Sequence, residues 1–458
     1  MMETDLRRAA REIFEATLKS VDASDAVRRA VRLEGSRLTI QETMFDLDAR
    51  GARIYALAVG KAAFPMAIAL DEILGKKISK GLIIAPENLD WFHELFFPPK
   101  KFTTPWRFCD GAHPLPKRSS FIAAQNSFKL LQRAHDEQAI VIFLISGGGS
   151  AMIEWPRDEQ IKLGDIRTAN RALISCGASI AEINAVRRAF SAVKGGGLAA
   201  RAPGADQVSL IVSDTGKGLE SIVASGLTYD TPVDAPDAAS VIARYELAER
   251  LPASILRAVN HSEDIPTLTS RQGLRKHYVL LDNDAALEAA AAEARGRGFR
   301  VEIARDISEQ PIAEGCAEML SRIFGMRAGA AAGEIVCLIS GGEFACPVRG
   351  EGIGGRNAET ALRGAIEMAE CIKQTSGGAN LSRVFILSAG TDGIDGNSLA
   401  AGAVADETTI KRAAARNLNA QSFLDKSDAY SFFETLGDAI VTGATGTNVR
   451  DLRIMLAV

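Results

Sequence analysis

Short apolar runs alternate with amphipathic segments along almost the whole chain, and this alternation limits the folds open to it. The runs are rich in β-branched residues and have the length of buried strands, whereas the segments between them carry apolar residues at helical spacing. Such strands, separated by helices, are typical of a largely parallel sheet covered on both faces. The sequence therefore predicts an α/β protein. The expected strands span residues 53–60, 80–86, 139–148, 207–214, 276–283, 299–304, 334–342 and 383–390.

The length of the chain and one break in the pattern predict two domains. A chain of 458 residues exceeds one ordinary core. The alternation pauses at 229–240, which is rich in Pro and Asp, and then resumes. We expect domains at 1–235 and 236–458, with a C-terminal stretch of about 20 residues that could return to the first domain.

The composition excludes several classes of protein. A formal net charge of −4 argues against a general nucleic-acid binder, which would carry a basic face. The 6 cysteines form no CxxC pair, so neither a zinc site nor a disulfide scaffold is indicated. No stretch approaches the roughly 20 apolar residues of a membrane span, and the charged N-terminal helix lacks the apolar core of a signal peptide. We expect a cytoplasmic globular protein with no nucleic-acid or membrane partner.

One phrase, LISGG, occurs in each half of the chain and places a glycine loop at the carboxyl end of a strand, where ligands bind in open α/β sheets. In the first copy, which continues as SGGGSA, Gly147, Gly148 and Gly149 can adopt positive φ and direct backbone N–H groups at an anion. Ser146 and Ser150 add hydroxyl donors. A tight turn without a ligand explains this loop equally well. If the two loops face each other, they form a cleft between the domains.

A second glycine-rich segment, GEGIGGRN, leads into a helix. Gly350, Gly352 and Gly355 satisfy the dinucleotide fingerprint G-x-G-x-x-G, but the preceding strand ends about ten residues earlier rather than running into the glycines. The segment instead delivers Arg356 and Asn357 to a helix start. Arginine offers a rigid fork for phosphate or carboxylate, which favours an anion site over a surface ion pair. Asn357 is as much a candidate helix cap as a ligand contact.

Lysines and carboxylates stand beside other turns. Lys61 in AVGKAA and Lys194 in AVKGGGLA lie next to glycines in apolar phrases, where a fixed ammonium could neutralise phosphate, although most lysines are solvated surface charges. Asp392 and Asp395 in GTDGIDG follow a strand and could ligate Mg²⁺ or serve only as turn residues. Asp214 also lies at a strand end.

These phrases together resemble one family. AVGKAA, GAHPLP, LISGGGSAM, INAVRRAFSAVKGGGLA, VASGLT, GGRNAETAL, SAGTDGIDG and TGATGTNVRDL occur in the order seen in class II glycerate 2-kinases, which carry a C-terminal MOFRL-type domain. The resemblance extends from Val59 to Leu452. It implies two Rossmann-like, three-layer α/β domains with the active site in the cleft between them, and phosphorylation of the 2-hydroxyl of D-glycerate by ATP with Mg²⁺.

The resemblance implies catalytic roles for Lys61 and Arg356, places SGGGS and Lys194 beside substrate and phosphates, and places GTDG near the metal and nucleotide. Together with the residues singled out above, this gives the full set of candidates. The catalytic candidates are Lys61, Arg356, Lys194 and Asp214; those for binding substrate and phosphate are Ser146, Gly147, Gly148, Gly149, Ser150, Gly355 and Asn357; those on the nucleotide and metal side are Glu343, Asp392 and Asp395, with Asp392 as the candidate metal ligand. Asp214 and Asp392 are alternative general bases, and a homodimer is a possible assembly.

The chain departs from the family pattern in two segments, and this leaves alternatives open. SDTGKGLES has Lys217 and Gly218 where the family has a different stretch with a carboxylate, and KGGGLA has Gly197 in place of an arginine. The acceptor could therefore be another small hydroxy acid or aldonic acid. An NAD(P)H-dependent hydroxypyruvate reductase is the other alternative, and it would need an acidic residue about twenty positions after the glycine fingerprint.

Overall fold

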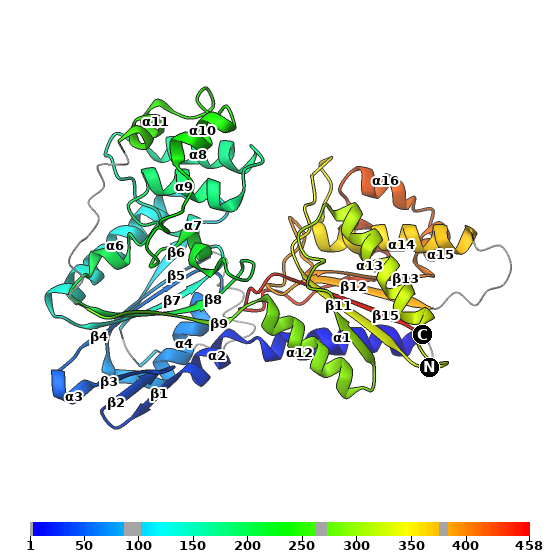
Figure 1. Cartoon of the computed structure of the whole chain (residues 1–458), viewed down its shortest axis with the longest axis horizontal. Helices are drawn as coiled ribbons and strands as arrows, with labels where there is room; N and C mark the ends of the chain where they lie inside the picture. Colours follow the sequence, from blue (N-terminus) through cyan, green and yellow to red (C-terminus); the bar gives the residue numbers. More distant parts are fainter. Residues whose placement is uncertain (1–2, 87–101, 104, 262–272, 375–382) are drawn as a thin grey trace. The chain divides into compact units, whose positions relative to one another are not determined.

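The computed structural model describes residues 3–86, 102–103, 105–261, 273–374 and 383–458, and the chain forms two compact units. One unit is Ala23–Leu281. The other is Asp282–Val458 together with the N-terminal segment that ends at Asp22. Each unit has its own six-stranded sheet (Figure 1). The predicted α/β class is confirmed, whereas a cleft between the two domains stays a prediction.

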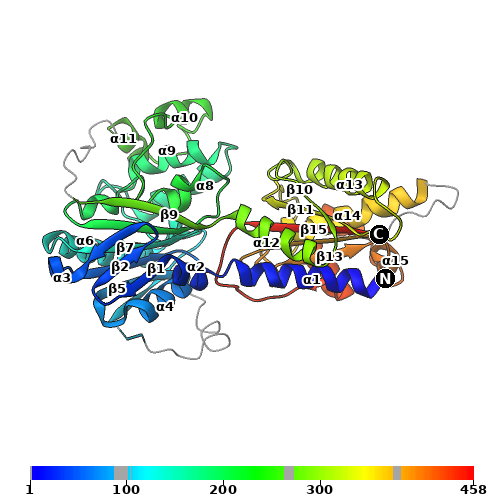
Figure 2. The same cartoon turned by 60° about the horizontal axis from the view of Figure 1, so that its bottom comes forward.

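The boundary between the units differs from the predicted break after residue 235. Strand β9 (Arg275–Leu281) pairs with β8 (Asp206–Val212), so the chain leaves the first sheet only after Leu281. The N-terminal helix α1 (Glu3–Ser20) packs on α12 (Asn283–Gly296) and so belongs to the same unit as residues Asp282–Val458 (Figure 2). Sheet pairing and helix packing, rather than the Pro- and Asp-rich segment, therefore decide the division.

The sheet of the Ala23–Leu281 unit is parallel throughout, as predicted. Its strand order is β6-β5-β4-β7-β8-β9. Along the chain, the first four strands of this sheet are β4 (Ile54–Val59), β5 (Ile78–Pro86), β6 (Trp106–Gly111) and β7 (Ile140–Ser146). Helix α6 (Arg118–Asp136) and helix α4 (Ala63–Leu74) both pack on this sheet, and they lie on opposite faces (Figure 1). Every residue of β4 and β7 is buried, which explains why both strands are apolar throughout.

Two additions to this unit were not predicted. A small antiparallel sheet consists of β1 (Val31–Glu34), β2 (Arg37–Ile40) and β3 (Thr43–Asp46). A group of helices shares its own apolar core, and these helices gather together in Figure 1. They are α8 (Leu163–Ile174), α9 (Ile180–Phe190), α10 (Ala238–Arg244) and α11 (Ala253–Asn260).

The second sheet is mixed, and here the prediction of a largely parallel sheet is wrong. Its order is β10-β11-β15-β12-β13-β14. The last strand, β15 (Asp451–Ala457), lies antiparallel between β11 (Val336–Gly342) and β12 (Val384–Gly390). The C-terminal stretch therefore completes the core of its own unit and does not return to the first. The outer strands are β10 (Arg300–Ile303), β13 (Gly402–Asp406) and β14 (Ala439–Ile440).

Helices cover both faces of this second sheet (Figure 1). Helices α1 and α12 pack on one face, and α13 (Ile312–Ala328) and α14 (Arg356–Gln374) pack on the other. The register of the three central strands places Gly342, Asp451 and Gly390 side by side. Among the described residues, no helix is both long enough and apolar enough to cross a bilayer.

Candidate functional site

The first glycine loop is tied to the loop that carries Lys61. The Oγ of Ser146, at the end of β7, accepts a hydrogen bond from the Ala62 N–H at 2.9 Å, and the Gly147 carbonyl accepts one from the Lys61 N–H at 2.9 Å. A Cβ on Gly60 would lie 2.3 Å from Ser146 Oγ, so only glycine permits this approach. The structure thus joins the ends of β4 and β7 at one edge of the sheet.

The Lys61 side chain lies beside the predicted anion loop. Gly148 has a φ of +80°, and a Cβ there would lie 3.2 Å from Lys61 Cγ and 3.4 Å from His113 Cδ2. The short helix α7 (Gly149–Met152) begins directly after it. A glycine in the left-handed region, a helical turn and a lysine therefore converge, which is an arrangement suited to an anion. The catalytic role of Lys61 stays a prediction.

Lys194 is placed differently from the expectation of an ammonium presented to phosphate. Its side chain is 1% exposed, and Nζ lies 2.5 Å from Glu154 Oε2 and 3.0 Å from the Ser150 carbonyl oxygen. Glu154 Oε1 also accepts hydrogen bonds from Ser191 Oγ at 2.5 Å and from the Trp155 N–H at 3.0 Å. Burial lowers the pKa of Lys194, although the neighbouring Glu154 opposes this. This geometry favours a role in holding Ser150 over direct contact with phosphate.

Asp214 follows β8 at the same sheet edge. Ser146 and Val212 are register partners, so the loop that begins with Ser213 leaves the sheet next to the glycine loop. Asp214 is half-buried, whereas Lys217 is exposed. The structure therefore places Asp214 on the same edge as the loop, while its role as general base stays a prediction.

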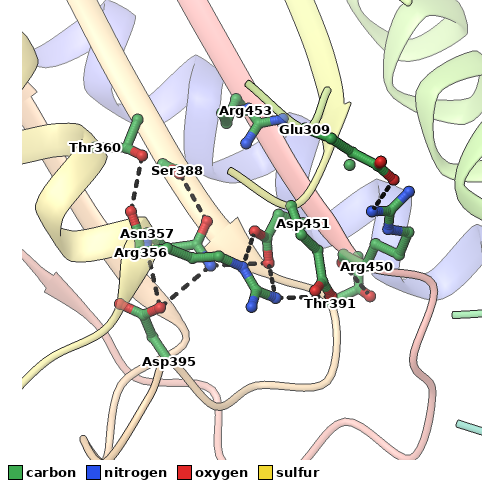
Figure 3. Close-up of polar contacts among 12 residues, drawn as sticks. Glu309, Arg356, Asn357, Thr360, Ser388, Thr391, Asp395, Arg450, Asp451 and Arg453 are labelled. Carbon is green, nitrogen blue, oxygen red and sulfur yellow. Dashed lines mark hydrogen bonds and ion pairs between the residues drawn. The ribbon is translucent and has the colours of Figure 1, made fainter. Parts of the chain in front are cut away.

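A second cluster of polar side chains surrounds the start of α14 in the other unit (Figure 3). Arg356 donates from Nε to Asp451 Oδ2 at 2.5 Å and from an Nη atom to Asp451 Oδ1 at 3.1 Å. A further ion pair joins Arg356 to Glu343 Oε1 at 2.8 Å. Burial by itself would lower the pKa of Arg356, but Asp451 and Glu343 raise it, so the guanidinium stays charged. With 34% of its side chain exposed, Arg356 is fixed but accessible.

Asn357 does not cap the helix, so that alternative is wrong. Helix α14 begins at Arg356, and the carboxylate of Asp395 takes the capping role by accepting the N–H groups of Asn357 at 2.9 Å and Ala358 at 2.8 Å. The Asn357 side chain is buried, donates to Asp451 Oδ1 at 2.9 Å and accepts from Ser388 Oγ at 2.7 Å. It therefore links the helix to two strands, β12 and β15.

The two aspartates of GTDGIDG differ in what they can bind. Asp395 is 2% exposed, and both of its oxygens are used by α14. Burial raises its pKa to about 7, while hydrogen bonds from Ala358 and Asn357 act in the opposite direction. Asp395 therefore anchors the helix and is poorly placed as a metal ligand. Asp392 is half-buried, and its Oδ1 accepts the N–H of Ile394 at 3.1 Å.

The carboxylates of Asp392 and Asp451 both approach the end of β12. A Cβ on Gly390 would lie 3.1 Å from Asp392 Oδ1 and 3.6 Å from Asp451 Oδ1. Across the described ranges, no group of three or more His, Cys, Asp or Glu side chains could hold a metal by itself. Magnesium is commonly held by one or two carboxylates together with phosphate oxygens and water. Asp392 fits such a partial site.

Matches to known proteins cover most of both units. Residues 9–260 match the family described as a domain of unknown function, DUF4147, and residues 336–451 match the MOFRL family. The glycerate kinase of Rattus norvegicus is 31% identical over 98% of this chain and 93% of its own length.

The chain belongs to the glycerate kinase family. Another relative, the D-glycerate 2-kinase of Thermotoga maritima, is 31% identical over 95% of this chain and 98% of its own length. A crystal structure of a glycerate kinase from Thermotoga maritima superposes with a TM-score of 0.77 at 30% identity, covering 99% of this chain and 100% of that chain. Both units of this family member therefore have counterparts in the relatives, in the same order.

The glycine fingerprint of this glycerate kinase family member lies in an unusual setting for a dinucleotide site. Strand β11 ends at Gly342, well before the glycines, and α14 follows them. A Cβ on Gly352 would lie 2.5 Å from Asp428 Cβ, and one on Gly355 would lie 2.3 Å from Asp395 Oδ1. Close packing against these side chains explains both glycines, so the fingerprint gives no support to a reductase.

Sequence reasoning missed two carboxylates of this family member. Asp451 stands in TGTNVRDL directly before an apolar run, and its position at the start of a strand was the available signal. Glu154 lies in the apolar phrase AMIEWP, where a lone charge predicts a buried partner. Neither phrase identifies the partner, because Arg356 and Lys194 are distant in sequence.

Proposed function

We propose that this protein is a D-glycerate 2-kinase, which transfers the γ-phosphoryl group of ATP to the 2-hydroxyl of D-glycerate and forms 2-phosphoglycerate and ADP. The observation that carries the proposal is the similarity to curated glycerate kinases over nearly the full length of both proteins. It is supported by a glycine loop beside Lys61 in one unit and a fixed arginine in the other. The predicted cytoplasmic location and homodimer stay predictions.

The residues suit phosphoryl transfer, which depends mainly on positioning and on neutralising charge. The N–H groups around Gly148 and the Lys61 ammonium provide a positive region for phosphate oxygens. Arg356 presents a charged fork whose orientation is set by Asp451 and Glu343, so little reorganisation is needed when charge develops. Asp214 and Asp392 are the candidate acceptors of the hydroxyl proton.

Magnesium fits the partly exposed carboxylates that follow β12 and β11. Asp392 would be its principal protein ligand, with Glu343 as a second candidate, because both are partly exposed. When bound, the ion would shield the charges of the nucleotide phosphates. Asp395 is excluded from this role in the proposal because α14 already uses both of its oxygens.

A coupled assay of ADP release tests the proposal. The full chain is supplied with ATP, MgCl₂ and D-glycerate, and the position of the new phosphate is determined by NMR. We expect Mg²⁺-dependent ADP release matched by 2-phosphoglycerate. Lys61→Ala should reduce kcat about 100-fold or more, whereas Lys77→Ala, which removes an exposed lysine of the same unit, should not.

The same preparation tests the alternatives. L-glycerate and short aldonic acids are offered as acceptors, and hydroxypyruvate is offered with NADH or NADPH while absorbance at 340 nm is followed. Turnover of an aldonic acid with no turnover of D-glycerate would replace the acceptor in the proposal. Oxidation of the reduced cofactor without any kinase activity would refute it.

A further inference from the structure

A strained turn lies against the glycine loop of the first unit. Ala224, Ser225 and Gly226 follow one another with φ values of 51°, 63° and 68°. Consecutive left-handed residues that include two with side chains are costly and occur mostly where the surrounding structure fixes them for a function. Here the N–H of Gly195 donates to the Ser225 carbonyl at 3.2 Å, and the N–H of Gly196 donates to the Gly226 carbonyl at 2.7 Å.

This turn directs the Ser225 hydroxyl into a chain of hydrogen bonds with Asn184 and Ser150. Ser225 Oγ donates to Asn184 Oδ1 at 2.8 Å, and it lies 2.7 Å from Ser150 Oγ. Asn184 is 1% exposed, so the hydrogen bond from Ser225 satisfies an oxygen that is removed from solvent. A hydroxyl has one hydrogen. Because that of Ser225 is given to Asn184, the Ser150 hydroxyl must donate to Ser225.

Ser150 is consequently oriented on both sides. Its carbonyl oxygen accepts a hydrogen bond from Lys194, and its hydroxyl hydrogen is directed towards Ser225. The residue before it, Gly149, is packed so closely that a Cβ there would lie 3.0 Å from Ala224 Cβ. Ser150 is nevertheless only half-buried. What its Oγ can offer a ligand is a lone pair, not a hydrogen.

We propose that Ser150, oriented by Ser225 and Asn184, accepts a hydrogen bond from the hydroxyl of the acid that is not phosphorylated. This inference rests on the proposed function. A serine that keeps its own hydrogen is too weak a base to take the proton of a reacting hydroxyl, and it cannot donate to phosphate while its hydrogen is held by Ser225. It does match a hydroxyl that stays protonated, such as the 3-hydroxyl of D-glycerate. Ser150 thus selects acids that carry a second hydroxyl group.

Comparison of D-glycerate with D-lactate, its 3-deoxy analogue, tests this role. The wild type should prefer D-glycerate in kcat/KM by about 10- to 100-fold, because D-lactate covers the Ser150 hydroxyl without giving it a hydrogen bond. Ser150→Ala should bring the ratio close to one through loss of activity on D-glycerate, with the KM for ATP within about twofold of wild type. Ser225→Ala, which keeps Ser150 but frees its hydrogen, should give an intermediate ratio.

The control is Ser127→Ala, which removes another buried serine of the same unit, whose hydroxyl donates to the Ala123 carbonyl within its own helix. It should retain the wild-type ratio. Where Ser225→Ala fails to fold, Ser225→Gly replaces it, because glycine tolerates the positive φ. The inference is overturned if Ser150→Ala keeps the wild-type preference for D-glycerate over D-lactate, whether its KM for ATP is unchanged or raised tenfold. A wild type that phosphorylates no hydroxy acid instead refutes the proposed function itself.

Discussion

Removal of the buried ion pair between Lys194 and Glu154 tests whether Lys194 takes part in catalysis or only holds the glycine loop. The two charged atoms lie 2.5 Å apart, and each side chain is 1% exposed. Lys194→Met would leave the buried Glu154 carboxylate with hydrogen bonds from Ser191 and the Trp155 N–H and with the charge of the half-buried Arg187. Loss of one member of a buried pair costs about 3–5 kcal/mol. For a unit of this size we expect its melting temperature to fall by about 6–20 °C.

The double variant Lys194→Met/Glu154→Gln removes both charges together. Glutamine keeps an oxygen for Ser191 and the Trp155 N–H, and methionine fills the space of the lysine stem. Replacement of both members of a buried pair by neutral groups is often close to neutral for stability, so most of the melting temperature should return. The Met side chain cannot donate to the Ser150 carbonyl, but Ser225 still holds the Ser150 hydroxyl, so if Lys194 has only a structural role, kcat should recover to within about tenfold of wild type. If its ammonium contacts the moving phosphate, a loss of about 100-fold or more should persist.

Differential scanning calorimetry and the ADP-release assay give the two readings. Calorimetry is used because the two units can melt separately, and only the transition of the Ala23–Leu281 unit should move. Lys77→Met, at an exposed position of the same unit, is the control and should melt like the wild type. Two results would refute the reasoning: an unchanged melting temperature for the single variant, or a stable double variant whose kcat stays a hundredfold low.

Two further predictions concern the cluster at the start of α14. Arg356→Lys keeps the charge but cannot reproduce the two hydrogen bonds to Asp451, so kcat should fall about 100- to 1,000-fold in the ADP-release assay while the melting temperature changes little. Burial raises the pKa of Asp395 to about 7, above its unfolded value of about 4. Between these pH values the native state binds a proton that the unfolded state lacks. The free energy of unfolding therefore falls as the pH rises, by up to about 1.4 kcal/mol per pH unit. Asp395→Asn should remove this contribution, and urea unfolding at pH 5 and pH 7 should then differ less than in the wild type.

Several features of the fold could be predicted from local sequence because a buried central strand must be apolar throughout. The runs that form β4 and β7 are identifiable for this reason, and the same pattern places Ser146 at a strand end. Glycines that allow close approach are also visible, as at Gly148, where the φ of +80° excludes most other residues. The start of α14 at Arg356 follows from the same kind of local pattern.

The sequence alone determined the α/β class, the glycine loop at the end of β7 and the position of Lys61 directly after another strand, because each depends on residues adjacent in the chain. The tertiary structure decided that β4 and β7 pair, which brings Lys61 beside the glycine loop. Only the tertiary structure decided that β15 enters its sheet between β11 and β12, and that Asp451 consequently meets Arg356. It also decided that Lys194 forms a buried ion pair with Glu154. An apolar pattern specifies that a strand is buried but not which strands lie beside it, so contacts between distant segments depend on strand order and packing.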